Sequence, residues 1–243
     1  EELAAYQGQT LATVLNQQSG FEISGSRGRP GEVLGVFVRG GRGSQVLVLL
    51  DGLRVSDPSS ASREYDLRLL PVANIESVEI LKGASSVLYG ANAATAVINI
   101  RTKTPEDTPL SMVAQGSIGT HNTAGESDLD LGRFSHFINL DGRQGGWDYK
   151  AAFSQQYTNG LSSLSVGMEE DPYSIWSLDL NVGRRISEKS RLGLFANNSR
   201  MKADFDDSFN GLDAPFQYRT AQERVGLRWE WKESLQQIQV TGA

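Results

Sequence analysis

The second half of the chain contains several segments in which apolar and polar side chains alternate over about ten residues. In one of them the alternating set is Trp176, Ser177, Leu178, Asp179, Leu180, Asn181 and Val182. A second segment alternates in the same way over residues 224–231. Because successive side chains of a β-strand point to opposite faces, this period of two predicts strands with one apolar and one polar face. From about residue 110 onward the pattern predicts roughly seven or eight strands.

Two architectures contain strands of this kind. In a transmembrane β-barrel the apolar face contacts lipid, whereas in a soluble β-sandwich it packs against a second sheet. The polar face favours the barrel, because a water-filled or plugged lumen accommodates charges. Such charges occur on predicted strands at Glu126, Asp128, Asp130, Arg224, Arg228 and Glu230. Aromatic residues near segment ends, which suit an interfacial girdle, are Trp147, Tyr157, Tyr173 and Trp231.

Hydropathy and charge exclude several other classes of protein. No window approaches about 18 consecutive apolar residues, which excludes a transmembrane helix. The net charge of −6 lies in residues 105–243, which carry 13 Lys/Arg against 19 Asp/Glu. An acidic half argues against nucleic-acid binding, which needs a basic surface. The absence of cysteine excludes disulfides, thiolate chemistry and Cys-based zinc sites.

Residues 1–104 follow a different pattern, which predicts a small α+β domain around a short mixed sheet. Thr10 is the expected N-cap of a helix over residues 11–17. Apolar runs predict buried strands at residues 46–50, 77–81 and 97–101. The Asp51-Gly52 pair predicts a hairpin turn that leads into a further short strand.

Two connections complete this domain. The small residues 84–94 predict a tight turn or a short helical connection between two of the strands. The polar segment 102–109 contains Pro105 and Pro109 and predicts a linker. The expected domains are therefore residues 1–104 and residues 105–243.

Three blocks of the first domain carry its densest motifs. The first is Val-Phe-Val-Arg-Gly at residues 36–40, leading into Val-Leu-Val-Leu-Leu-Asp-Gly-Leu-Arg-Val at residues 46–55. The second is Leu-Pro at residues 70–71, followed by Ile-Glu-Ser-Val-Glu-Ile-Leu-Lys-Gly at residues 75–83. The third is Ala-Ser-Ser-Val-Leu-Tyr-Gly-Ala-Asn-Ala at residues 84–93, closing with Val-Ile-Asn-Ile at residues 97–100. In order and spacing, roughly residues 8–103 resemble the plug domain of TonB-dependent outer-membrane receptors.

Two positions depart from the family pattern. Ala94-Thr95-Ala96 stands where the family often has two glycines, and Lys82-Gly83 stands where it often has Arg-Gly. Both departures are mild. The resemblance implies a plug followed by the first antiparallel strands of a barrel that closes with about twenty-two strands. Residues 105–243 are expected to supply only part of that barrel.

The resemblance also implies a function. Receptors of this family take up a scarce, large nutrient across the outer membrane of a Gram-negative bacterium, with the plug inside the barrel lumen gating the passage. The energy comes from the inner membrane through TonB, whose contact segment is expected to precede or include residues 1–6. The expected ligand is cobalamin or a ferric siderophore, with cobalamin ahead. The alternative is import of an oligosaccharide or peptide together with a surface lipoprotein, and outer-membrane lipids are further expected partners.

Residues 26–34 and 54–66 correspond to the plug loops that face the ligand in similar receptors. Glycines in the first loop permit unusual backbone angles, and hydroxyl and carboxylate groups in the second offer hydrogen bonds. The expected ligand-binding residues are Arg27, Arg29, Ser56, Asp57, Ser59 and Ser60. Plain flexible loops are the alternative.

Charged residues beside the plug strands are expected to pair with charges of the barrel lumen. Such pairs would act as reversible locks, because water and a mechanical pull replace them at modest cost. The expected locking residues are Arg39, Glu79 and Lys82. The alternative is an ordinary solvated face.

An acidic segment lies between two predicted strands at residues 189–199 and 216–231, and it contains Asp204, Asp206, Asp207 and Asp213. Clustered carboxylates can hold Ca²⁺ through hard oxygen ligands. Acidic loops that bind calcium are a feature of the vitamin B12 receptors, which the early strands resemble. Ca²⁺ is therefore an expected optional ligand of an extracellular loop, with a solvated acidic loop as the alternative, and no other cofactor is expected.

The sequence contains no recognisable catalytic motif. Gly-x-Ser-x-Gly and His-Glu-x-x-His are both absent, and neither histidine lies near a plausible nucleophile. The chain is therefore not expected to be an enzyme.

Overall fold

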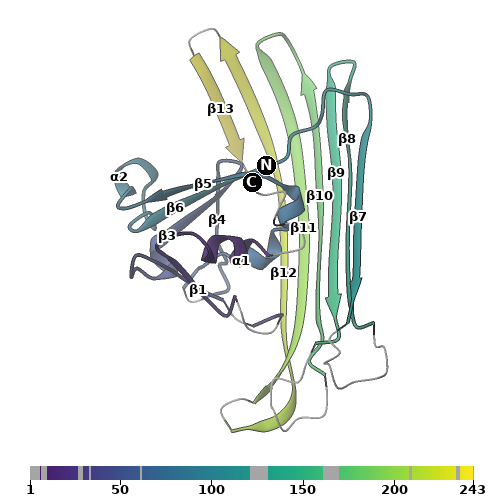
Figure 1. Cartoon of the computed structure of the whole chain (residues 1–243). Helices are drawn as coiled ribbons and strands as arrows, with labels where there is room; N and C mark the ends of the chain where they lie inside the picture. Colours follow the sequence, from purple (N-terminus) through teal and green to yellow (C-terminus); the bar gives the residue numbers. More distant parts are fainter. Residues whose placement is uncertain are drawn as a thin grey trace. The chain divides into compact units, whose positions relative to one another are not determined.

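The computed structural model describes residues 6, 10–26, 30–32, 34–60, 62–120, 131–160, 170–207, 210–233 and 236–242, without the side chains of residues 212, 213, 236, 237 and 239. The chain divides into two compact units, Glu1–Lys103 and Thr104–Ala243 (Figure 1). No helix in the described part of the chain is long and apolar enough to cross a membrane.

The first unit begins with a short helix and a pair of strands. Thr10 Oγ1 accepts the backbone N–H of Thr13 at 3.2 Å, so it caps α1 (Leu11–Asn16) as predicted. The buried face of α1 packs against β1 (Phe21–Ser24) and the 3₁₀ turn η3 (Leu67–Leu69). β1 pairs antiparallel with β2 (Gly35–Val38). Two further 3₁₀ turns, η2 (Gly43–Gln45) and η4 (Val72–Asn74), precede strands of the main sheet.

The main sheet of this unit is mixed, as the sequence predicts. Its strands are β3 (Val46–Leu50), β4 (Leu53–Val55), β5 (Ile75–Lys82) and β6 (Ala96–Thr102), in the order β4-β3-β6-β5. β3 and β6 are parallel, whereas the other two pairs are antiparallel. The two central strands are the most apolar and the most buried, because both of their faces are covered.

The turn between β3 and β4 uses the residue pair that predicted it. Asp51 and Gly52 both have positive φ, 50° and 82°, as a tight hairpin turn with two left-handed residues requires. The Asp51 carboxylate also accepts the backbone N–H of Thr102 at 2.8 Å and its hydroxyl at 2.9 Å. The turn is thereby tied to the end of β6.

The connection between β5 and β6 contains the short helix α2 (Ser86–Tyr89), one of the two forms predicted for residues 84–94. Tyr89 packs on a small cluster of Leu47, Ala93 and Val97. Val87 and Leu88 point outward with 99% and 84% of their surface exposed.

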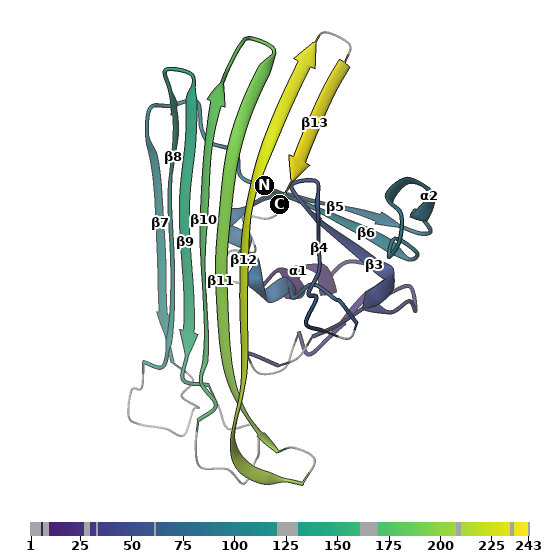
Figure 2. The ribbon, with the colours of Figure 1, turned by 180° about the vertical axis from the view of Figure 1, so that it is seen from behind.

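The second unit is one antiparallel sheet that follows chain order (Figures 1 and 2). Within the described ranges its seven strands are β7 (Ser111–Gly119), β8 (Arg133–Gln144), β9 (Trp147–Thr158), β10 (Tyr173–Arg185), β11 (Ser190–Asp207), β12 (Leu212–Glu233) and β13 (Gln236–Gly242). Connections at one end are short turns at residues 145–146 and 186–189. The other end has the long connections at residues 120–132 and 159–172. These ends are called the short-turn end and the loop end.

The acidic segment is not the loop that the sequence analysis expected. Asp204, Asp206 and Asp207 belong to β11, and Asp213 belongs to β12. The prediction was wrong because it relied on alternation of apolar and polar residues. That alternation stops where a strand no longer has an apolar environment to face, although backbone pairing continues. The expected charged strand with Glu126, Asp128 and Asp130 lies outside the described residues.

Candidate functional site

The seven-stranded sheet has an apolar face and a polar face. On β10, Leu178, Leu180 and Val182 belong to the apolar face, and Asp179 and Asn181 to the polar face. Register extends each face across the sheet: Leu180 lies between Ala151 of β9 and Ala196 of β11, whereas Asp179 lies between Ala152 and Asn197. The predicted alternation is therefore a property of the whole sheet and not of single strands.

The band of apolar residues shifts along the strands from one side of the sheet to the other. At the loop end, the band begins on β7 to β9 with Ile118, Phe134 and Tyr157, in register with Ser174. On β11 and β12 it begins at Ala196 and Val225, in register with Leu180, six residues further along β10. The whole shift, about 20 Å at about 3.3 Å per residue, falls between β9 and β11. Barrel strands incline by about 35–45° to the barrel axis.

The length of the band can be compared with the lipid-facing surface of a barrel. On β9 it runs from Trp147 to Tyr157, a rise of about 33 Å along the strand. At the inclination of barrel strands, this segment would span roughly 25 Å, the height of the lipid-facing band of an outer-membrane barrel. Trp147 and Tyr157 stand at the two limits of the band on β9, as the sequence predicts. Tyr173 was wrongly assigned to the girdle: it alternates with Ser174, which pairs with Tyr157, and it is buried on the polar face.

The polar face carries a buried hydrogen-bond network between β10 and β11. The Asn197 amide donates to the Asp179 carboxylate at 2.8 Å. The Ser199 and Ser177 hydroxyls are 3.0 Å apart, and Ser177 donates to Asp179 at 3.2 Å. Ser177 and Ser199 are almost completely buried. The network satisfies polar groups that would otherwise be costly to bury.

An ion pair crosses over β10 near the short-turn end of the polar face. Arg191 of β11 donates from Nε to Asp148 of β9 at 2.8 Å, and Nη2 donates to the second carboxylate oxygen. Nη1 lies 3.3 Å from Glu230 of β12. The intervening strand has Gly183 at the crossing point, where a Cβ would lie 2.5 and 2.6 Å from the Asp148 oxygens and also against Arg191 Nη2. The ion pair therefore depends on the absence of a side chain at Gly183.

The linker is fixed to the short-turn end of β8. The Glu106 backbone N–H donates to the buried Asp141 carboxylate at 2.7 Å, and Arg143 N–H donates to the Thr108 carbonyl at 2.7 Å. At Gly142 a Cβ would lie 2.9 Å from that carbonyl oxygen and against the backbone of Pro109. The linker is thus held by β8 at close range.

The second predicted ligand loop of the first unit is ordered by its own side chains. Asp57 accepts the backbone N–H of Ser59 at 2.9 Å and its hydroxyl at 2.6 Å. Ser60 Oγ lies 3.0 Å from Ser62 Oγ. Ser56 is exposed. Arg27 and Arg29 of the first loop lie outside the described residues, so the joint role of both loops in ligand binding stays a prediction.

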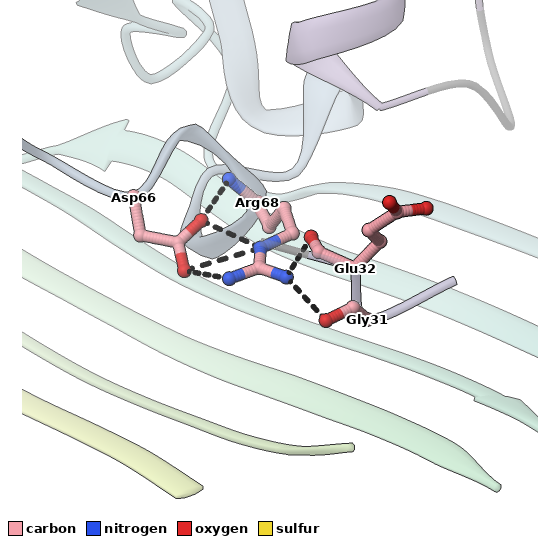
Figure 3. A network of polar contacts seen from close by, with 4 residues as sticks. All are labelled: Gly31, Glu32, Asp66 and Arg68. Atoms are coloured by element: carbon pink, nitrogen blue, oxygen red, sulfur yellow. Dashed lines mark hydrogen bonds and ion pairs between the residues drawn. The ribbon is translucent and has the colours of Figure 1, made fainter. Parts of the chain in front are cut away.

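An arginine that the sequence analysis missed connects the two loop regions (Figure 3). Arg68 donates from Nε to Asp66 at 2.8 and 3.1 Å and from Nη2 at 2.6 Å. Its Nη1 donates to the carbonyls of Gly31 at 2.8 Å and Glu32 at 2.6 Å. The Arg68 side chain is only 7% exposed. Its partners lie 36 and 37 residues earlier in the chain, a separation that no local motif reveals.

The expected locking residues have partners inside the first unit. Glu79 accepts from the Asn99 amide at 3.0 Å and lies 3.5 Å from Arg101. Lys82 Nζ donates to the Ser19 carbonyl and stands 5.8 Å from the centre of the Phe21 ring. Arg39 is an exposed turn residue with a φ of 50°. Their role as locks stays a prediction.

Three acidic side chains of the long hairpin each have a hydrogen-bond partner of their own. Asp204 accepts from the Gln217 amide at 2.7 Å, Asp206 is buried and accepts the Ala214 N–H at 3.3 Å, and Asp207 accepts from the Asn210 amide at 2.6 Å. Among the described side chains, which exclude that of Asp213, no three acidic or histidine residues are arranged to hold a metal ion. Calcium binding stays a prediction.

Comparison with known proteins places these features in a family. The sequence model of the TonB-dependent receptor plug domain matches residues 1–97, which cover nearly all of the first unit. The match identifies the first unit as a TonB-dependent receptor plug domain.

Among curated proteins, the chain is similar to vitamin B12 transporters. It is 38% identical over 117 residues to BtuB of Vibrio vulnificus, covering 48% of this chain and 19% of that protein. It is 27% identical over 219 residues to BtuB of Photobacterium profundum, covering 88% of this chain and 33% of that protein. The chain thus spans between about a fifth and a third of the length of these relatives.

Solved structures share the fold of both units. A variant of the ferric enterobactin receptor PfeA from Pseudomonas aeruginosa matches 94% of this chain and 37% of its own, with a TM-score of 0.70 and 17% identity. The siderophore receptor PirA from Acinetobacter baumannii matches 96% of this chain and 36% of its own, with a TM-score of 0.72 and 15% identity. At these identities the likeness defines the fold alone.

Proposed function

We propose that the chain is the N-terminal part of an outer-membrane transporter that takes up a cobalamin with energy delivered through TonB. The observation that supports cobalamin as the ligand is the 38% identity to a vitamin B12 transporter. The relatives with siderophore ligands are similar at 17% and 15% identity only, so they support the fold and do not favour their own ligand. Since the relatives are transporters and receptors, a catalytic role has no support.

The second unit supports a position in the outer membrane. Its apolar band would have the height of a lipid-facing barrel surface at the usual inclination of barrel strands. Outer-membrane barrels place short turns on the periplasmic side and long loops outside. The short turns at residues 145–146 and 186–189 would then face the periplasm, and the connections at residues 120–132 and 159–172 would face the medium.

In this proposal the plug gates the passage, and the loops at residues 26–34 and 54–66 contact the ligand. Arg39, Glu79 and Lys82 would lock the plug, and Asp206 with its acidic neighbours would bind Ca²⁺ and order the long hairpin. An import complex with a surface lipoprotein is the alternative, and no feature of the described residues favours it.

Spectrophotometric titration of the full-length receptor with cyanocobalamin and with ferric enterobactin tests the ligand. We expect saturable binding of cyanocobalamin and none of the siderophore. Ser56→Ala should weaken cyanocobalamin binding about fivefold, the loss of one hydrogen bond of about 1 kcal/mol. Gln18→Ala, an exposed position outside both loops, is the matched control and should bind like the wild type.

Uptake of labelled cobalamin by cells tests the energy source separately. Cells that express the receptor should accumulate the label only when TonB is present. Binding of ferric enterobactin without binding of cyanocobalamin would overturn the assignment of cobalamin as the ligand. Equal uptake in cells without TonB would overturn the mechanism even if cobalamin binds.

A further inference from the structure

The apolar face carries an isolated cation near the short-turn end. Arg184 is exposed and belongs to the same face of β10 as Leu180 and Val182. Its cross-strand neighbours are Trp147 of β9 and Leu192 of β11. The guanidinium stands 4.7 Å from the centre of the Trp147 ring, a cation–π contact.

The surroundings of Arg184 on this face are uncharged. The next row towards the loop end contains Tyr149, Val182, Leu194 and Leu227. Within the described part of the chain, Arg184 forms no ion pair with a carboxylate, and the Trp147 indole N–H has no hydrogen-bond acceptor. The pair therefore presents guanidinium and indole donors that no acceptor among the described residues uses.

A second arginine on the same face shows the contrasting arrangement. Arg200 stands 5.8 Å from the centre of the Trp176 ring near the loop end. Unlike Arg184, it has a carboxylate partner, Glu223, at 3.6 Å. Among the residues that the structure describes, two Arg–Trp pairs thus occur on one face, and only the pair at the short-turn end lacks a neutralising partner.

The environment of the pair defines its ligand. An arginine at the limit of a lipid-facing band extends its charged end towards the headgroups, where tryptophan also concentrates. Guanidinium and phosphate form charge-assisted hydrogen bonds of well-matched geometry. Acyl chains of the same molecule would lie on the aliphatic side chains of the neighbouring rows.

We propose that Arg184 and Trp147 bind the phosphate of an anionic phospholipid in the periplasmic leaflet of the membrane. This inference rests on the proposed position of the sheet in the outer membrane. A net negative headgroup is favoured, because the ammonium group of a zwitterionic headgroup competes with Arg184 for the same phosphate.

Native mass spectrometry of the full-length receptor, released from nanodiscs of equimolar phosphatidylglycerol and phosphatidylethanolamine, tests the site. We expect the wild type to retain phosphatidylglycerol and Arg184→Gln to retain about tenfold less. Arg184→Lys should retain an intermediate amount. Arg200→Gln removes a similar Arg–Trp pair that is already neutralised, so it should retain lipid like the wild type. Equal retention by Arg184→Gln and wild type would overturn the site, as would an equal loss in Arg200→Gln.

A labelling experiment separates the lipid site from the proposed placement. Lys189→Cys puts a thiol in the short turn beside Arg184. On intact cells a membrane-impermeant maleimide should leave this thiol unlabelled and should label it after the outer membrane is opened. Labelling on intact cells would contradict the periplasmic placement and the lipid site together. A periplasmic turn without phosphatidylglycerol retention would contradict the lipid site alone.

Discussion

Gly183→Ala should destabilise the sheet by breaking the ion pair between Arg191 and Asp148. The new Cβ would lie 2.5 and 2.6 Å from the Asp148 oxygens, closer than any real contact. The clashing atoms are the ends of flexible side chains, so the pair separates before the backbone moves. This leaves the Asp148 side chain, which is only 13% exposed, without its partner.

Two opposing effects set the magnitude. A hydrogen-bonded charged group that loses its partner costs about 1.5–3 kcal/mol. Replacing a strand glycine by alanine returns about 0.5–1 kcal/mol through lower chain entropy in the unfolded state. The loss is larger, and we expect a net decrease of about 1–2 kcal/mol in the free energy of unfolding, measured by urea titration of the full-length receptor in phospholipid vesicles.

Gly193→Ala is the matched control. Gly193 pairs with Gly183 in the register, but its Cβ would meet Arg191 only at 3.5 Å or more, which is ordinary contact. It should be neutral or slightly stabilising. In an Asp148→Asn background the ion pair is already weakened, so Gly183→Ala should cost much less there. Wild-type stability of Gly183→Ala, or an unchanged cost in that background, would refute the reasoning.

Three further substitutions test single contacts. Arg68→Gln should speed hydrogen exchange at residues 31–32 at least tenfold, because it removes the bonds to their carbonyls, whereas exchange in α1 should stay unchanged. Gly142→Ala should expose the linker to proteases, because its Cβ would meet backbone atoms of Pro109 that cannot rotate away; equal cleavage rates would contradict this. Asp51→Ala should lower the urea stability of the plug by about 1–3 kcal/mol through the two bonds to Thr102, and Thr102→Ala should account for only part of that loss.

Local signals predicted the parts of the fold that depend on neighbouring residues. The Thr10 cap, the β3 run and the Asp51-Gly52 turn each follow from a few adjacent side chains, and the structure has all three. The length of the β11–β12 hairpin did not follow, because its outer part has no apolar face to produce alternation.

The missed site residues share one property: their roles depend on contacts between distant segments. Arg68 holds carbonyls 36 and 37 residues away, and Gly183 is required by an ion pair whose partners lie on two other strands. In the sequence, nothing distinguishes Arg68 from the other charged residues or Gly183 from the other glycines. Only strand register reveals that Asp148, Gly183 and Arg191 converge.

The strand directions in the first unit have a mechanical consequence. β1 and β2 are antiparallel neighbours in sequence, so a pull on the chain before β1 opens their hydrogen bonds one after another, like a zip. β3 and β6 are parallel, so tension between the start of β3 and the end of β6 loads their hydrogen bonds together, in shear. A force applied at the N-terminus would therefore separate β1 from β2 first. The parallel pair of β3 and β6 would then resist further unfolding. The first unit therefore combines an N-terminal strand pair that separates at low force with a central strand pair that resists a higher force.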